Sequence, residues 1–185
     1  MKKEELRKIN KQKRKELSLC EVKEKSEKAT KSFINSDVYK NAKVIMLYYP
    51  IGNETDTSYI YSQALEDNKT VVFPVTDIET NEMTAVIANK STQFSKGGYS
   101  VFEPCDKKEF DKKLIDVVIV PGIAFDKMGF RVGFGKGCYD RFLYKTNAIK
   151  VGYCYDFQKV LTIRKDNFDI KMDYLVSESG MIVCE

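Results

Sequence analysis

The segment GFRVGFGKGCYDRF, residues 129–142, gathers the residue types that bind phosphate groups. It contains three alternating glycines, Gly133, Gly135 and Gly137. Glycine permits positive φ angles and lets backbone N–H groups approach an anion closely. Arg131 and Lys136 add full positive charges, and Asp140 follows about one helical turn beyond the last glycine, close enough to hold a cation that bridges phosphates. We therefore expect a phosphate-binding loop here.

This loop matches neither of the two most familiar phosphate-binding motifs. A Walker A loop has glycine where this chain has Phe130, and Ser or Thr where it has Gly137. The third glycine of a dinucleotide fingerprint would fall on Cys138. A tight turn whose glycines serve packing is the alternative interpretation. The interleaved Arg131, Lys136 and Asp140 favour phosphate binding.

The composition limits the available chemistry. The chain has no histidine, which excludes histidine-based acid–base catalysis and makes a zinc site unexpected. Its five cysteines are scattered, with no C-x-x-C pair, so neither a metal site nor a disulfide framework is indicated. Catalysis must then depend on carboxylates, Lys, Arg, Tyr, backbone amides and a hard metal ion.

The spacing of apolar residues predicts short strands alternating with helices. Helices are expected over residues 3–17, 21–34 (with Ser18 as N-cap), 58–68 and 138–146. Strands are expected over residues 43–50, 70–75, 83–88, 117–125, 148–156, 173–179 and 181–185, whereas residues 89–113 read as a loop followed by a short charged helix. The first helix should bury a stripe of Leu6, Ile9 and Leu17. This alternation predicts a single α/β domain over residues 1–185, with a largely parallel sheet flanked by helices.

The net charge of +4 is concentrated at the N-terminus. Of 31 Lys and Arg and 27 Asp and Glu, residues 1–16 contain eight and three, so the rest of the chain is almost neutral. That balance argues against a nucleic-acid-binding module, which needs a broad basic face. The basic N-terminus lacks the apolar core of a secretory signal, and no apolar run is long enough to span a bilayer, so we expect a cytoplasmic protein with no membrane or nucleic-acid partner.

The segment PGIAFDKMGFRVGFGKGCYDRFL, residues 121–143, closely resembles the signature of the 5-formyltetrahydrofolate cyclo-ligase (5,10-methenyltetrahydrofolate synthetase) family. Four weaker segments occur in the family's order: KKEELRK, ETDT, KGGYSVFEP and KMDYLVSE. The resemblance implies an α/β domain of the kind shared with sugar-phosphate isomerases and CoA transferases. It also implies conversion of 5-formyltetrahydrofolate to 5,10-methenyltetrahydrofolate, with Mg²⁺ as cofactor and ATP split to ADP and phosphate.

The resemblance further implies roles for individual residues. Those expected to bind ATP are Lys2, Lys3, Arg7, Arg131, Gly133, Phe134, Gly135, Lys136, Gly137, Cys138 and Tyr139. Arg131 and Lys136 are also the expected catalytic charges. Tyr49 and Glu54 are expected to contact the folate, and Asp140 and Asp173 are expected at the magnesium ion.

Two points qualify this expectation. Cys138 stands where the family pattern has tyrosine, which should alter nucleotide affinity rather than activity. An enzyme resembling sugar-phosphate isomerases, using the glycine loop for its substrate's phosphate and a carboxylate as base, is the alternative. It would leave the cationic N-terminal helix without a purpose. We expect a monomer, and the sequence leaves open whether the folate carries a polyglutamate tail.

Overall fold

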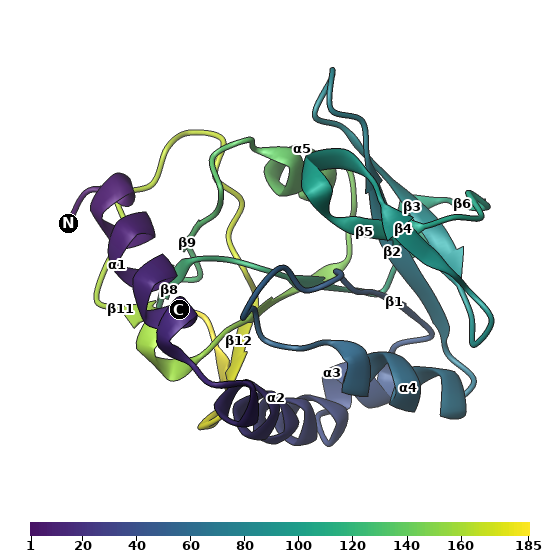
Figure 1. Ribbon diagram of the computed structural model, residues 1–185, viewed down its shortest axis with the longest axis horizontal. Helices are drawn as coiled ribbons and strands as arrows, with labels where there is room; N and C mark the ends of the chain where they lie inside the picture. Colours follow the sequence, from purple (N-terminus) through teal and green to yellow (C-terminus); the bar gives the residue numbers. More distant parts are fainter.

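An eight-stranded β-sheet with helices on both faces forms the centre of the molecule (Figure 1). The computed structural model describes residues 1–185. In spatial order the strands are β13 (Gly180–Val183), β12 (Tyr174–Ser177), β10 (Ile149–Tyr153), β7 (Val117–Val120), β1 (Val44–Met46), β2 (Thr70–Thr76), β3 (Met83–Ala88) and β6 (Glu109–Phe110). The strands from β12 to β2 are parallel, whereas β13, β3 and β6 pair antiparallel with their neighbours. The predicted α/β fold with a largely parallel sheet is confirmed.

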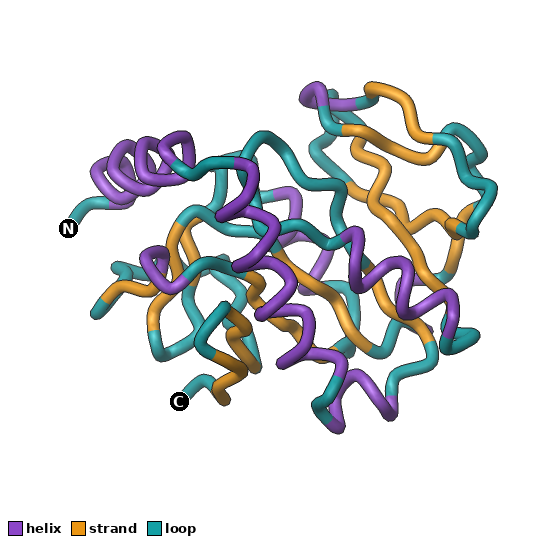
Figure 2. The backbone as a smooth tube through the Cα atoms, turned by 60° about the horizontal axis from the view of Figure 1, so that its bottom comes forward, coloured by secondary structure: helices purple, strands orange, loops and turns teal.

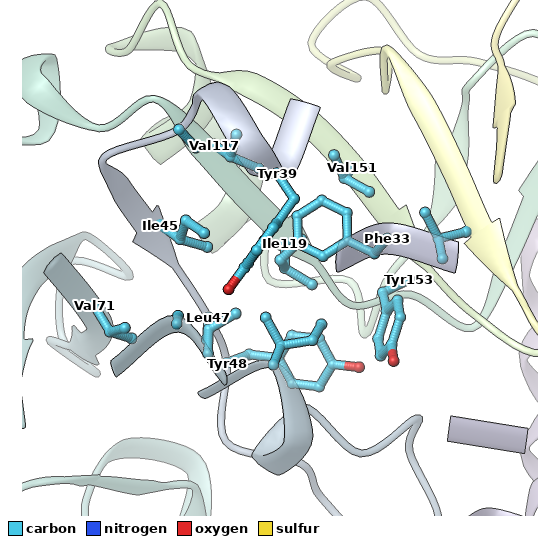
Figure 3. Packing of buried hydrophobic residues seen from close by; sticks show 14 of the residues in the cluster. Phe33, Tyr39, Ile45, Leu47, Tyr48, Val71, Val117, Ile119, Val151 and Tyr153 are labelled. Carbon is cyan, nitrogen blue, oxygen red and sulfur yellow. The ribbon is translucent and has the colours of Figure 1, made fainter. Parts of the chain in front are cut away.

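Four of the five helices cover the two faces of the large sheet, and the first helix lies on a smaller sheet beside it. The helices are α1 (Lys3–Glu16), α2 (Leu19–Ile34), α3 (Asp37–Asn41), α4 (Ser58–Glu66) and α5 (Cys138–Tyr144). Helices α2, α3 and α4 line up along one face, as the backbone trace shows (Figure 2). Successive strand residues point to opposite faces, so Ile45 joins the core beneath these helices and Met46 joins the core that contains α5. Figure 3 shows the first of these cores, where Phe33 and Tyr39 pack against Ile119 and Val151.

The start of α2 follows the sequence closely. Ser18 Oγ accepts a hydrogen bond from the backbone of Glu21, and the Glu21 carboxylate accepts one from the backbone of Ser18. This reciprocal pair satisfies N–H groups that a helix start leaves open. The predicted cap at Ser18 is confirmed.

Helix α1 buries Leu6 as predicted but not the rest of the predicted stripe. Its buried residues are Leu6, Asn10 and Arg14, whereas Ile9 is 41% exposed. The helix packs on a small three-stranded sheet, ordered β11 (Lys159–Val160), β8 (Ala124–Asp126) and β9 (Arg131–Val132). Because two of the three buried side chains are polar, α1 is anchored by hydrogen bonds as well as by apolar contact.

The predicted strand over residues 117–125 is wrong in one respect, since it breaks into two strands that belong to different sheets. Strand β7 ends at Val120, and β8 begins at Ala124. Pro121 between them has no N–H to continue the pairing. The ring of Phe125 lies where a side chain on Gly122 would stand, 2.4 Å from an added Cβ. A β8–β9 hairpin therefore separates β7 from the glycine loop and places Arg131 on a strand.

Residues 89–113, predicted as a loop, form short strands. The hairpin of β4 (Phe94–Lys96) and β5 (Phe102–Pro104) stands above β2, and β6 extends the sheet. Short 3₁₀ turns span Gly98–Ser100, Lys112–Leu114 and Asp156–Gln158, of which the second replaces the predicted charged helix. No helix combines the length and the apolar character that a bilayer crossing requires.

Candidate active site

A cavity of about 610 Å³ opens at the carboxyl ends of β1, β2 and β7. In parallel α/β sheets this edge is where ligands bind. Segments far apart in the sequence meet there: the start of α1, residues 48–54, the β4–β5 hairpin, the glycine loop and residues 166–169. The volume lies within the ordinary range for small-molecule sites. The fold therefore brings most of the predicted site residues to one place.

Two of the three glycines in the loop have the predicted backbone geometry. Gly135 has φ +99° and Gly137 has φ +68°, a region that residues with a side chain rarely adopt. Gly133 does not have a positive φ, and a side chain there would meet nothing within 4 Å. Its carbonyl instead accepts a hydrogen bond of 2.9 Å from Nε of Arg7, which ties the loop to α1.

Arg131 and Asp140 form a pair on the cavity wall. A guanidinium nitrogen of Arg131 lies 2.9 Å from Oδ1 of Asp140, and a second donates to the carbonyl of Ile170 at 3.1 Å. The same Oδ1 accepts from the backbone N–H of Ile170. Arg131 is 6% exposed, so its charge is held in place rather than solvated. Oδ2 of Asp140 accepts no hydrogen bond from the protein.

Lys136 and Phe134 stand at the exposed part of the loop. The Lys136 ammonium makes no ion pair and lies 5.6 Å from the centre of the Tyr99 ring, across the cavity. The ring of Phe134 is 48% exposed, with the ammonium of Lys11 4.9 Å from its centre. Lys136 is thus a positive charge facing the cavity that no carboxylate neutralises.

At the N-terminus, Lys3 lines the cavity but Lys2 does not. The Lys3 ammonium is 2.7 Å from a carboxylate oxygen of Asp166 and 2.6 Å from one of Asp169. Burial opposes its charge, but these two hydrogen bonds outweigh it and raise the pKa of Lys3. Lys2 lies at the start of α1, where its backbone N–H donates to Glu5.

Glu54 is a buried carboxylate on the cavity wall, 4% exposed. Oε1 accepts from Arg14 at 3.1 Å, and Oε2 accepts from the backbone N–H of Ile51 at 2.9 Å. Burial raises the pKa of Glu54, and Arg14 and the Ile51 N–H oppose that rise. The carboxylate is therefore fixed in position by its two partners.

Three predicted ring or thiol side chains also line the cavity. Tyr49 packs against Phe94 and Phe102 of the hairpin, with ring centres 5.3 and 5.0 Å away. The hydroxyl of Tyr139 is buried without a hydrogen-bond partner, and burial raises its pKa strongly. Burial likewise raises the pKa of the Cys138 thiol.

The similarity of the chain to known proteins decides its family. Residues 1–178 match the model of the 5-formyltetrahydrofolate cyclo-ligase family. The chain belongs to this family. A 5-formyltetrahydrofolate cyclo-ligase of Mycoplasma pneumoniae is 30% identical over 182 residues, which cover 96% of this chain and 99% of that protein.

Solved structures of cyclo-ligase relatives have the same fold as this chain. The NMR structure of Aquifex aeolicus 5,10-methenyltetrahydrofolate synthetase superposes with a TM-score of 0.87 at 33% identity, covering 100% of this chain and 94% of that one. The 5,10-methenyltetrahydrofolate synthetase of Mycoplasma pneumoniae gives a TM-score of 0.78 at 27% identity, covering 96% and 99%. The predicted family and fold, and the prediction of a ligase of folate metabolism, are confirmed.

Asp173 is the predicted site residue that the structure places elsewhere. It precedes β12, at the amino end of a parallel strand, and does not line the cavity. Its carboxylate accepts from the backbone and the ammonium of Lys150 at 2.7 and 3.3 Å. It stabilises the starts of β10 and β12, and the structure does not bring it together with Asp140 in the cavity.

Three residues of this cyclo-ligase cavity, and one residue buried behind it, were missed from the sequence. The residue behind it is Arg14, one of the eight cations of residues 1–16, which is buried against Glu54. Asp166 and Asp169 lie in a polar stretch without a motif. Glu103, within the family segment KGGYSVFEP, is 7% exposed and accepts from the backbone of Thr76 at 2.9 Å. Its place in that segment was the one available signal.

Proposed function

We propose that this cyclo-ligase converts 5-formyltetrahydrofolate to 5,10-methenyltetrahydrofolate, with ATP as the co-substrate that is split to ADP and phosphate. The observation that carries the proposal is one cavity that holds an unpaired lysine on a glycine loop, Lys136, and a fixed buried carboxylate, Glu54. The lysine suits a phosphate and the carboxylate suits a ring with N–H donors. A single site of this kind can bring two such substrates into contact.

ATP lies along the glycine loop. Lys136, the backbone N–H groups near Gly135 and Gly137, and the cations Lys3 and Arg7 are suited to its phosphates. Lys3 is already paired with Asp166 and Asp169, so it contributes less than Lys136 to binding the ATP phosphates. Phe134, Cys138 and Tyr139 pack at the edge of the nucleotide.

The folate lies on the other side of the cavity. Glu54 accepts hydrogen bonds from the amino and ring N–H groups of the pterin, because a carboxylate has free lone pairs beyond the two that Arg14 and Ile51 occupy. Tyr49, packed on the hairpin, gives the pterin an aromatic edge. A few fixed polar groups in an otherwise apolar wall orient such a ligand.

Phosphoryl transfer explains why no histidine is needed. The formyl oxygen attacks the γ-phosphorus of ATP, and the bond to ADP breaks. The neighbouring folate nitrogen then attacks the formyl carbon, loses its proton and expels the oxygen as phosphate, which closes the five-membered ring. Such transfers depend on positioning and on charge stabilisation. Lys136 supplies positive charge at the transferred group, while Arg131 holds Asp140 beside it.

The residues present fit a magnesium ion bound mainly through ATP. Asp140 lines the cavity, and its Oδ2 accepts no hydrogen bond from the protein. Mg²⁺ is commonly held by one or two carboxylates together with substrate phosphates. No cluster of three acidic, cysteine or histidine side chains forms a complete protein site. When bound, the ion would neutralise charge on the phosphates. A monomeric state, a cytoplasmic location and the absence of nucleic-acid or membrane partners stay predictions.

The test mixes purified protein with 5-formyltetrahydrofolate, ATP and Mg²⁺ and follows the near-ultraviolet absorbance of the methenyl product. The control omits ATP. We expect a rise that depends on ATP. If the absorbance does not rise but the folded protein binds ATP, the phosphoryl acceptor is another molecule. If the absorbance does not rise and ATP does not bind, the sugar-phosphate interpretation of the glycine loop is favoured.

A further inference from the structure

One face of α1 contacts four separate segments of the chain, three of which line the cavity. Lys3 contacts residues 166–169, Arg7 contacts the carbonyl of Gly133, Asn10 donates to the carbonyl of Ile123 at 3.0 Å, and Arg14 contacts Glu54. These positions follow one another at helical spacing, so they share a face. The helix thus joins the glycine loop to the segment that carries Glu54.

Arg14 is the most buried of the three cations on this face. It is 8% exposed, its guanidinium carbon lies 5.9 Å from the centre of the Phe134 ring, and its Nη1 lies 3.1 Å from Glu54 Oε1. The guanidinium therefore stands between an aromatic ring of the glycine loop and the carboxylate. No role has been assigned to it so far.

The charge around Glu54 depends on Arg14. The ionisable groups that face the carboxylate are Arg14 from α1, the phenol of Tyr48 after β1 and the phenol of Tyr139 from α5. Both phenols are buried, and burial raises the pKa of each, so they stay neutral. Arg14 is consequently the one cation that offsets the burial of Glu54.

We propose that Arg14 is a positioning residue for the folate and that it keeps the Glu54 carboxylate ionised and directed into the cavity. The carboxylate can then accept hydrogen bonds from two N–H groups of the pterin. This inference rests on the folate role proposed for Glu54. A protonated Glu54 would offer one oxygen as a donor where the pterin also presents donors. An unpaired Glu54 would also be free to rotate away from the position that Ile51 and Arg14 fix.

The test compares Arg14→Met, which removes the charge, with Arg14→Lys, which keeps it without the guanidinium. Lys15→Met is the matched control, because Lys15 is an exposed cation of the same helix without an ion pair. For Arg14→Met we expect KM for 5-formyltetrahydrofolate to rise roughly tenfold or more, as expected for a lost charged hydrogen bond, with KM for ATP changed less than about twofold. Arg14→Lys should recover part of the loss, and Lys15→Met should behave as the parent protein.

The pH profile separates positioning from a structural role. Arg14 lowers the pKa of Glu54, so removing it raises that pKa, and the acid limb of kcat/KM for the folate should shift to higher pH. An unshifted acid limb, or equal rises in KM for the folate and for ATP, would overturn the proposal. If Arg14→Met does not fold, the Arg14→Lys profile decides, since its weaker pairing should give a smaller shift in the same direction.

A double-mutant cycle with Glu54→Gln completes the test. In the Glu54→Gln background, Arg14→Lys should add little to the folate KM, because the charge on which it acts is gone. Additive losses would overturn the positioning role. If Glu54→Gln alone leaves the folate KM unchanged while turnover is normal, the proposed folate role of Glu54 fails, and if the parent protein shows no turnover the proposed reaction itself fails. Each of these results is distinct from an unshifted Arg14 profile.

Discussion

Two walls of the same cavity are built from different interactions. The charged wall consists of α1, the glycine loop (residues 133–137) and residues 166–169, joined by Lys3, Arg7 and their oxygen partners. The hairpin wall consists of Tyr49 and the β4–β5 hairpin, where ring packs on ring at centre distances of 5.0 to 5.3 Å. The charged wall is suited to bind an anion, and the hairpin wall is suited to pack against a flat ring.

This difference shows how the two walls should respond to change. Exposed ion pairs each contribute little to stability and are screened by salt. Buried aromatic contacts contribute more and depend little on salt. We therefore expect damage to the hairpin wall to appear first as lost stability, and damage to the charged wall to appear first as lost activity.

The largest loss of stability should follow Phe73→Ala. Phe73 is 3% exposed and packs beneath the hairpin wall, with edge-to-face contacts to the rings of Tyr61 and Phe94. Deleting a buried phenyl ring costs about 3–5 kcal/mol in the free energy of unfolding. Urea unfolding at low and at high salt should give the same loss. Phe168→Ala, at a ring that is 86% exposed, is the control and should change the unfolding free energy by less than about 0.5 kcal/mol; similar losses in both variants would contradict the comparison.

The charged wall should be most sensitive at Lys136. Lys136→Ala removes a cavity cation without an ion pair, so the unfolding free energy should hardly change. We expect kcat/KM to fall roughly 10²-fold, about 2.7 kcal/mol in the barrier, as for loss of one transition-state donor. Lys107→Ala is the matched control, because Lys107 is exposed and outside the cavity. Near-normal turnover of Lys136→Ala would remove this lysine from the phosphate site.

Two buried carboxylates of the cavity, one paired with a cation and one not, extend the comparison. Glu54 is paired with Arg14, whereas Glu103 on the hairpin has no cation partner and accepts from the backbone of Thr76. Glu54→Gln removes the charge that the pterin needs, so KM for 5-formyltetrahydrofolate should rise roughly tenfold with ATP affinity nearly intact. Glu103→Gln keeps the accepting oxygen and should leave both KM values within about twofold. Steady-state titration of each substrate measures this, and a larger folate effect for Glu103→Gln would reverse the assignment of the carboxylates.

The sequence predicted the parts of the fold whose signals are local. Ser18 and Glu21 mark the start of α2. The glycine loop lies at the carboxyl edge of the sheet as predicted, although the β8–β9 hairpin separates it from β7. The break at Pro121 was missed because the apolar residues on both sides of Pro121-Gly122 were interpreted as one strand, although a Pro-Gly pair is a local turn signal. The β4–β5 hairpin was missed because its strands are three residues each, too short for a pattern.

The site was predictable where a motif existed and not where long-range contacts decide. Arg14 lies 40 residues from Glu54, and nothing local distinguishes it from the exposed cations beside it. Its helical spacing from Arg7 predicts a common face, but the exposed Lys11 is spaced from Arg7 in an equivalent way. The place of Asp173 outside the cavity could not be predicted, because a carboxylate before a strand looks the same in sequence at either edge of the sheet.

The smallest effect should come from Lys3, whose charge is already shared between Asp166 and Asp169. Lys3→Met should raise KM for ATP only about two- to fivefold and change the unfolding free energy by less than about 1 kcal/mol. The paired Lys3 has a pKa raised above its ordinary 10.5, so its stabilisation is complete below that pH and is lost as pH rises through the higher value. ATP titrations at low and high ionic strength should show the difference from the parent protein shrinking with salt, with the exposed Lys8→Met as control. A loss as large as that of Lys136→Ala would mean that Lys3 leaves its aspartates to meet the phosphates directly, and the charged wall would then rearrange when ATP binds.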